Sequence, residues 1–169
     1  MKFSQIVAVT ALVGLVGGLL ATNARAEVSG TSTGGGFVRE VPEGSKGKSQ
    51  ATKTMLSLTA FDNTDGDSGN ANYVVQQPKS KPSTHLRLTL DCVTVSGNQA
   101  FASGVDRNDD RYYLIVEDNG EPGRNNDEFG LAGDSITRSI AFLLGLDCGA
   151  IDFGTDPING GNFRVVEAS

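Results

Sequence analysis

Residues 92–121 read C-V-T-V-S-G-N-Q-A-F-A-S-G-V-D-R-N-D-D-R-Y-Y-L-I-V-E-D-N-G-E. Short polar turns separate the apolar runs of this stretch. The turn at 96–98 holds a glycine and an asparagine, which tolerate the positive φ that hairpin turns require. The run at 112–116 is almost continuously apolar, as expected of a strand that is buried on both faces. The stretch therefore predicts consecutive β-hairpins, with a cysteine at the head and carboxylates at the tail.

The same pattern extends along the chain on both sides. Apolar and polar residues alternate at 54–61 and at 86–92, and the phase slips after Cys92, which predicts a β-bulge or a change of neighbouring strand there. Further short strands are predicted at 73–75, 100–105, 129–131 and 163–166. Residues 134–145 fit a short helix and a strand equally well. The fold class is therefore all-β: a single antiparallel β-sandwich or β-barrel of about 7–9 short strands, with room for one short helix.

The first 26 residues are predicted to be a secretory signal peptide. Lys2 gives a positive start, an uncharged apolar run follows over 6–21, and residues 24–26 form an A-x-A cleavage site. The apolar run is shorter than the roughly 20 residues that a membrane span needs. We therefore expect cleavage after residue 26, a secreted product that is periplasmic or extracellular, and no membrane span after cleavage.

Removing the signal peptide leaves residues 27–169, which is the size of one ordinary domain. Residues 27–52 are dominated by Gly, Ser, Thr, Lys and Glu, with three consecutive glycines at 34–36. Because such a segment buries little apolar surface, we expect a flexible N-terminal arm with at most an edge strand at Phe37-Val38. Residues 53–169 would then form the β-domain.

The charge of the chain disfavours two classes of partner. Lys2 and Arg25 leave with the signal peptide, so 12 basic residues face 20 acidic ones and the formal net charge is −8. Affinity for phosphate groups comes largely from Lys and Arg, so an acidic surface repels both nucleic acid and anionic lipid. We expect no nucleic-acid partner.

Cys92 and Cys148 are the two cysteines of the chain. In an exported protein an even pair predicts a disulfide bond. The bond would close a loop of about 57 residues, which the chain-entropy model values at roughly 4 kcal/mol. The alternative is two free thiols or two metal ligands, although the chain has no C-x-x-C motif and His85 is its one histidine.

The first acidic loop, residues 62–70, reads D-N-T-D-G-D-S-G-N. Asp62, Asp65 and Asp67 offer the closely spaced oxygens that Ca²⁺ prefers. The spacing of an EF-hand fails, however, because Ser68 and Val74 stand where its glycine and its bidentate glutamate belong. A polar hairpin loop is therefore favoured over a calcium site, and we expect no required cofactor.

Glu117, Asp118 and Glu121 form the second acidic loop, joined by Asp127 and Glu128. Paired carboxylates hydrolyse glycosides when they face each other about 5–10 Å apart in a cleft. Here they lie beside Gly and Pro in a turn that is expected to face solvent, and the chain has no Trp on which a sugar could stack. We expect no catalytic residue among them. A weak calcium-stabilised loop is the alternative.

The order of motifs resembles a family of small secreted bacterial proteins that is grouped near the post-COAP domain. The resemblance rests on G-G-G near the mature N-terminus, C-V-x-V-S-G-N, V-E-D-N-G-E, a second cysteine downstream and a closing G-N-F-R-V. It implies a β-rich exported domain in which Cys92 and Cys148 pair. Because the family has no established activity, it implies no catalytic residue.

These observations favour a non-enzymatic extracellular or periplasmic domain that binds or structures something outside the cell, because loops on a rigid sheet usually carry binding residues. The expected partner is an unknown extracellular ligand or surface component. Two alternatives remain open. One is a calcium-dependent module that uses the 62–70 or 117–128 loop, and the other is a carboxylate-based hydrolase that uses Glu117 with Glu121 or Asp118.

Overall fold

The computed structural model describes residues 28–42, 51–78, 81–133 and 154–168. Within these ranges nine antiparallel strands form one sheet, which confirms the all-β prediction, and the described segments include no helix that could cross a membrane. The strands are β1 (Val28–Glu40), β2 (Thr52–Asn63), β3 (Ser68–Gln76), β4 (Thr84–Ser96), β5 (Gln99–Val105), β6 (Arg111–Glu117), β7 (Glu128–Gly133), β8 (Asp156–Pro157) and β9 (Gly160–Glu167). The predicted signal peptide, the ambiguous segment 134–145 and Cys148 lie outside the described residues.

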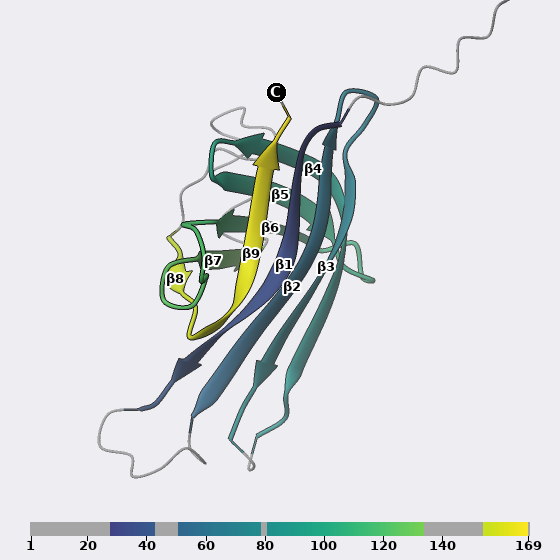
Figure 1. Cartoon of the computed structure of the whole chain (residues 1–169). Helices are drawn as coiled ribbons and strands as arrows, with labels where there is room; N and C mark the ends of the chain where they lie inside the picture. The colour runs from purple at the N-terminus through teal and green to yellow at the C-terminus, as the bar shows by residue number, and fades with distance from the viewer. Residues whose placement is uncertain (1–27, 43–50, 79–80, 134–153, 169) are drawn as a thin grey trace, which may run out of the picture.

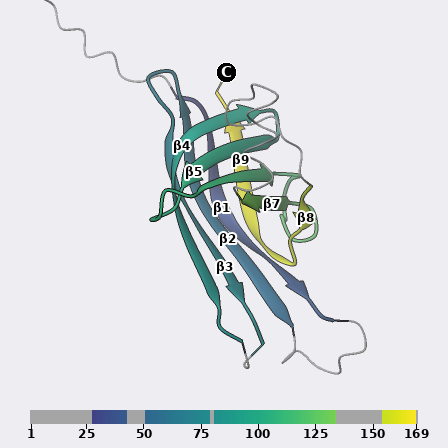
Figure 2. The same cartoon turned by 180° about the vertical axis from the view of Figure 1, so that it is seen from behind.

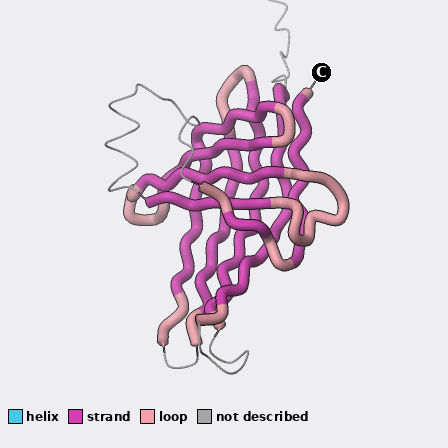
Figure 3. The backbone as a smooth tube through the Cα atoms, turned by 90° about the vertical axis from the view of Figure 1, so that its left-hand side faces the viewer, coloured by secondary structure: helices cyan, strands magenta, loops and turns pink. Residues whose placement is uncertain are grey.

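The strand order is β8-β7-β6-β5-β4-β3-β2-β1-β9. Each strand from β1 to β7 pairs with the next one in sequence, and β9 returns to pair with β1. The sheet curls so that β5, β6 and β7 cross in front of or behind β1 and β9, depending on the side of view (Figure 1 and Figure 2). Figure 3 shows the same crossing from the side. The architecture is a half-barrel in which one folded sheet provides both layers.

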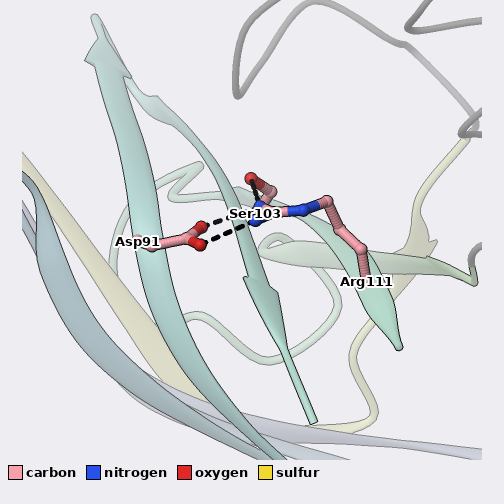
Figure 4. Close-up of polar contacts among 3 residues, drawn as sticks. All are labelled: Asp91, Ser103 and Arg111. Atoms are coloured by element: carbon pink, nitrogen blue, oxygen red, sulfur yellow. Dashed lines mark hydrogen bonds and ion pairs between the residues drawn. The ribbon is translucent and has the colours of Figure 1, made fainter. Parts of the chain in front are cut away.

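The sheet changes direction within β4. The pairing of β4 with β3 ends at Leu90, and its pairing with β5 shifts register between Leu90 and Cys92. The bulge and the change of neighbour predicted beside Cys92 are therefore confirmed. Asp91 lies at this bulge and accepts two hydrogen bonds of 2.7 Å from Arg111 of β6, which also donates to Ser103 of β5 at 3.0 Å (Figure 4). The ion pair thus joins three strands where the sheet bends.

The core lies between the two halves of the curled sheet. On β2 the inner positions 56, 58 and 60 are buried and the outer ones 57 and 59 are exposed, as the alternation predicts. On β6 three successive residues, 114–116, are buried, which confirms the prediction of a strand covered on both faces. Phe129 of β7 meets Phe163 of β9 edge to face, with 6.0 Å between the ring centroids. The two halves therefore share one apolar interior.

Residues 28–40 contradict the predicted flexible arm over 28–36 and confirm the strand expected at Phe37-Val38. They form β1, which pairs with β2 on one side and, from Gly30 to Phe37, with β9 on the other. The physical reason is close packing: a Cβ at Gly30 would lie 2.5 Å from the Cβ of Val95, and a Cβ at Gly36 would lie 2.8 Å from Ile158. Glycine lets the side chains of the crossing strands pack directly on the β1 backbone. Residues 43–50 lie outside the described residues.

Candidate functional site

The outer edge of β9 is closed by aspartates from the second acidic loop. Asp127 Oδ2 accepts the backbone N–H of Phe163 at 2.7 Å, and Asp118 Oδ2 accepts that of Val165 at 3.0 Å. Alternate residues of a strand point their N–H groups to the same edge, so these two groups both point away from β1. Since β9 ends the strand order of the described sheet, the two carboxylates take the place of a neighbouring strand.

Asp127 is the centre of this closure. It is fully buried, and its second oxygen accepts the backbone N–H of Asn119 at 3.0 Å. Its own carbonyl accepts the N–H of Ile158 at 2.9 Å, which ties the segment before β9 to the same loop. The expectation of a solvent-facing acidic turn is therefore wrong for Asp127 and for the half-buried Glu117 and Asp118. A buried carboxylate is tolerated here because backbone donors satisfy both of its oxygens.

Asp62 and Asp67 of the first acidic loop accept backbone N–H groups of β4 in the same way. The pairing of β4 with β3 stops near the first residue of β3. Past that point, Asp67 Oδ2 accepts the backbone N–H of Val93 at 2.7 Å and Asp62 Oδ2 accepts that of Val95 at 3.1 Å. The second oxygen of Asp67 accepts the N–H of Asn63 at 3.0 Å within the turn. The first acidic loop thus continues, with side chains, the hydrogen bonding that β3 provides to the first half of β4.

These contacts give a structural role to two of the three aspartates that were considered for a calcium site. Asp62 and Asp67 direct carboxylate oxygens at backbone donors, and Asp65 is exposed in the turn between them. Within the described part of the chain, no group of three or more His, Cys, Asp or Glu side chains is placed to hold a metal ion. The geometry offers no observation that favours a calcium-dependent module.

The three carboxylates considered for hydrolysis bind three different residues. Glu117 accepts a hydrogen bond of 2.6 Å from the side chain of Gln99 on β5, and Glu121 accepts one of 2.7 Å from the side chain of Asn162 on β9. Asp118 holds the N–H of Val165, as described above. Each of the three therefore has a separate partner, and none of them lines the cleft described next.

A cleft of about 400 Å³ lies where the inner face of β1, β2 and β3 continues beyond the core. Its volume falls within the roughly 300–1,000 Å³ that is usual for small-molecule sites. The floor is formed by Val38, Glu40, Thr52, Thr54, Tyr73 and Val75. The wall is formed by Phe129, Gly130, Leu131, Gly154 and Asp156, which belong to β7, to β8 and to the residues just before β8.

Strand register explains why these residues meet. Thr54 of β2 pairs with Val38 of β1 and with Val75 of β3, and Thr52 pairs with Glu40. Paired residues project to the same face, so all five line one surface. On β2 the inner positions are apolar from 56 to 60 and become threonine at 54 and 52. This change from apolar to polar marks the point where the core ends and the cleft begins.

The pKa of Tyr73 shows which charges act within the cleft. Burial raises the pKa of its phenol above the usual 10.0, a hydrogen bond with Thr54 lowers it, and the charges of Asp156 and Glu40 raise it further. The two carboxylates therefore act on one point, Glu40 from the floor and Asp156 from the wall. The described residues that line the cleft include no Lys, Arg or His. The cleft is a partly apolar, hydroxyl-bearing site with a negative potential.

The sequence did not predict this cleft. The threonines at the start of β2, on the face that elsewhere carries leucine, were the one local signal for its floor. The wall depends on strands that are distant in sequence, and β8 has only two residues. Cys92 is half-buried on β4, and because Cys148 lies outside the described residues the disulfide stays a prediction.

Comparison with known proteins gives no relative from which a role could be transferred: no family model matches the chain, and no curated protein or solved structure matches it. The resemblance to small secreted bacterial proteins therefore stays a prediction. The site is interpreted from its own geometry.

Proposed function

We propose that the protein is a secreted, non-enzymatic binding domain whose ligand site is the cleft between β1–β3 and β7–β8. The cleft itself carries the proposal. It combines a volume of about 400 Å³ with apolar side chains and a few convergent polar groups on rigid strands. The volume and the convergent polar groups fit a small-molecule binding site, and the exposed lining is more polar than in most such sites. Tyr73 is the central polar group, because it is half-buried and lines the cleft together with Thr54, Glu40 and Asp156.

Binding rather than catalysis is supported by the use that the fold makes of its acidic loops. Asp118 and Asp127 hold β9, and Asp62 and Asp67 hold β4. A general acid or base must reach its substrate, and these four aspartates instead bind backbone N–H groups. In a panel of glycosides, esters and peptides we expect no turnover by the purified protein. Turnover that is lost in Glu117→Gln or Glu121→Gln would contradict the proposal.

The ligand site is tested by filling the cleft. Thr52→Trp places an indole on the floor, whereas Thr59→Trp makes the same substitution on the exposed face of the same strand. In a ligand-observed NMR screen of a small-molecule library, we expect hits that bind the unsubstituted protein and the Thr59→Trp variant equally. The same hits should lose binding to the Thr52→Trp variant. Hits that bind all three proteins alike would place the site elsewhere and refute the proposal.

Export is tested separately. The exported protein should begin at Glu27, because the A-x-A site ends at Ala26. N-terminal sequencing of protein recovered from outside the cytoplasm checks this. Recovery of the uncleaved chain in the cytoplasm would contradict the secreted part of the proposal, while leaving the binding site untouched.

A further inference from the structure

We infer that the cleft takes a small organic cation, a ligand with an ammonium group and an apolar body. The inference rests on the proposed function and goes further by naming the chemistry of the ligand. It is carried by the placement of Glu40 and Asp156 on opposite sides of a cleft whose remaining side chains are apolar or hydroxyl-bearing.

The charge of the cleft selects for a cation. Glu40 ends β1 on the floor, and Asp156 stands in β8 on the wall, directly opposite Phe129 in the strand register. Both act on the phenol of Tyr73, so a charged group beside that phenol would feel both carboxylates. Two negative charges around one point repel an anionic ligand and attract a cationic one.

Nearby basic residues do not neutralise this charge from within the cleft. Arg39 and Lys53 are paired with each other, one residue away from the cleft-lining positions, so the pleat of the strands turns them to the outer face. Lys53 confirms this placement, because its Nζ lies 4.3 Å from the centroid of the Phe37 ring, another outer-face residue. Around the cleft, Arg39 and Lys53 therefore lie on the outer face of the sheet, whereas Glu40 and Asp156 line the cleft.

Most of the exposed lining of the cleft is polar, and a smaller part of it is an apolar surface that a ligand could contact. Val38, Val75 and Leu131 supply aliphatic surface from three strands, and Phe129 supplies an aromatic ring at the deep end, where it joins the core. The ring of Tyr73 also lines the cleft, where its π face can attract a cation. A ligand would therefore bury its apolar part toward Phe129 and keep its ammonium group between Glu40 and Asp156.

The inference is tested with three probes of matched size: 2-phenylethylammonium, 2-phenylethanol and 3-phenylpropanoate. Each is titrated into the purified protein, and backbone amide shifts of the cleft strands are followed by NMR. We expect the ammonium probe to bind most tightly and the carboxylate probe most weakly. Because Glu40 and Asp156 are exposed, Glu40→Gln or Asp156→Asn should each weaken the ammonium probe by only about two- to five-fold. Added salt should weaken it too.

The matched control is Asp65→Asn, which removes one negative charge from an exposed turn at the opposite end of the β2–β3 hairpin. It should leave the affinity for the ammonium probe unchanged. Equal binding of the alcohol and the ammonium probe, or an affinity that is insensitive to Glu40→Gln and Asp156→Asn, would overturn the inference and leave the proposed function standing. Absence of cleft shifts with all three probes would also overturn it, and the Thr52→Trp screen then decides the proposed function independently.

Discussion

The carboxylate of Asp127 accepts the backbone N–H of Phe163 at 2.7 Å and is fully buried as it does so. This contact joins the second acidic loop to the last strand of the sheet. An unpaired strand edge is a site for unwanted pairing with other chains, so an edge closed by side chains also protects the protein from aggregation. Four aspartates close strand edges in this way: Asp62, Asp67, Asp118 and Asp127.

Asp127→Asn should destabilise the fold strongly. The amide keeps one acceptor oxygen but turns an NH₂ group toward a backbone donor, which leaves a buried N–H unsatisfied. We expect the free energy of unfolding to fall by about 2–3 kcal/mol in urea titrations. Asp65→Asn, in the exposed turn, should change it by no more than about 0.5 kcal/mol. Equal losses of unfolding free energy in the two variants would show that the buried contact of Asp127 contributes no more to stability than an exposed aspartate does.

The Asp91–Arg111 pair should contribute modestly. Its side chains are 47% and 32% exposed, so water screens the attraction. Asp91→Ala should lower the free energy of unfolding by about 0.5–1 kcal/mol. A double-mutant cycle with Arg111→Ala measures the coupling directly, and a coupling of zero would mean that the bulge alone sets the bend of β4.

Ser32 provides a substitution that should stabilise the protein. It is fully buried on β1, and its Oγ has no hydrogen-bond partner among the described residues. Ser32→Ala removes this cost and should raise the free energy of unfolding by up to about 1 kcal/mol. Ser103 is also buried, but its Oγ accepts a hydrogen bond from Arg111, so Ser103→Ala should lower stability instead. A loss of stability in both variants would contradict the claim that the Ser32 hydroxyl is buried without a hydrogen-bond partner.

Tyr73 should make stability depend on pH in the alkaline range. Burial raises the pKa of its phenol above 10.0 in the folded state. The neutral phenol is thus favoured by folding, so its contribution is fully present below pH 10 and is lost as the pH rises through the folded-state value. Absorbance titration at the tyrosinate band should show a late-titrating group that is absent from Tyr73→Phe. A late group that persists in the variant would assign the shift to another tyrosine.

Much of the fold could be predicted from the sequence because it depends on local patterns. The Ser96-Gly97-Asn98 turn, the alternation on β2 and the phase slip beside Cys92 each reflect the pleat or a turn, and each is confirmed. Most of β1, apart from the strand expected at Phe37-Val38, was missed because burial was judged from side-chain size. In β1 the glycines are buried by the side chains of other strands, such as Val95, which a single segment cannot reveal.

The roles of the acidic loops could not be predicted for a similar reason. Asp127 and Phe163 are 36 positions apart, and only the curl of the sheet brings them together. From sequence the same aspartates fit a turn, a calcium loop or a catalytic pair. The cleft could not be predicted for the same reason. Its floor comes from β1–β3 and its wall from β7 and β8, which only the curl of the sheet brings together.

Hydrogen exchange at β9 tests most directly the central claim that the acidic loops complete the fold by closing its strand edges. We predict slow exchange of the Phe163 and Val165 amides, although they face the outer edge of the last strand. In Asp127→Asn the Phe163 amide should exchange much faster, while the Arg164 amide, which faces β1, should stay protected. Exchange of Phe163 and Val165 at free-solvent rates in the unsubstituted protein would contradict the account.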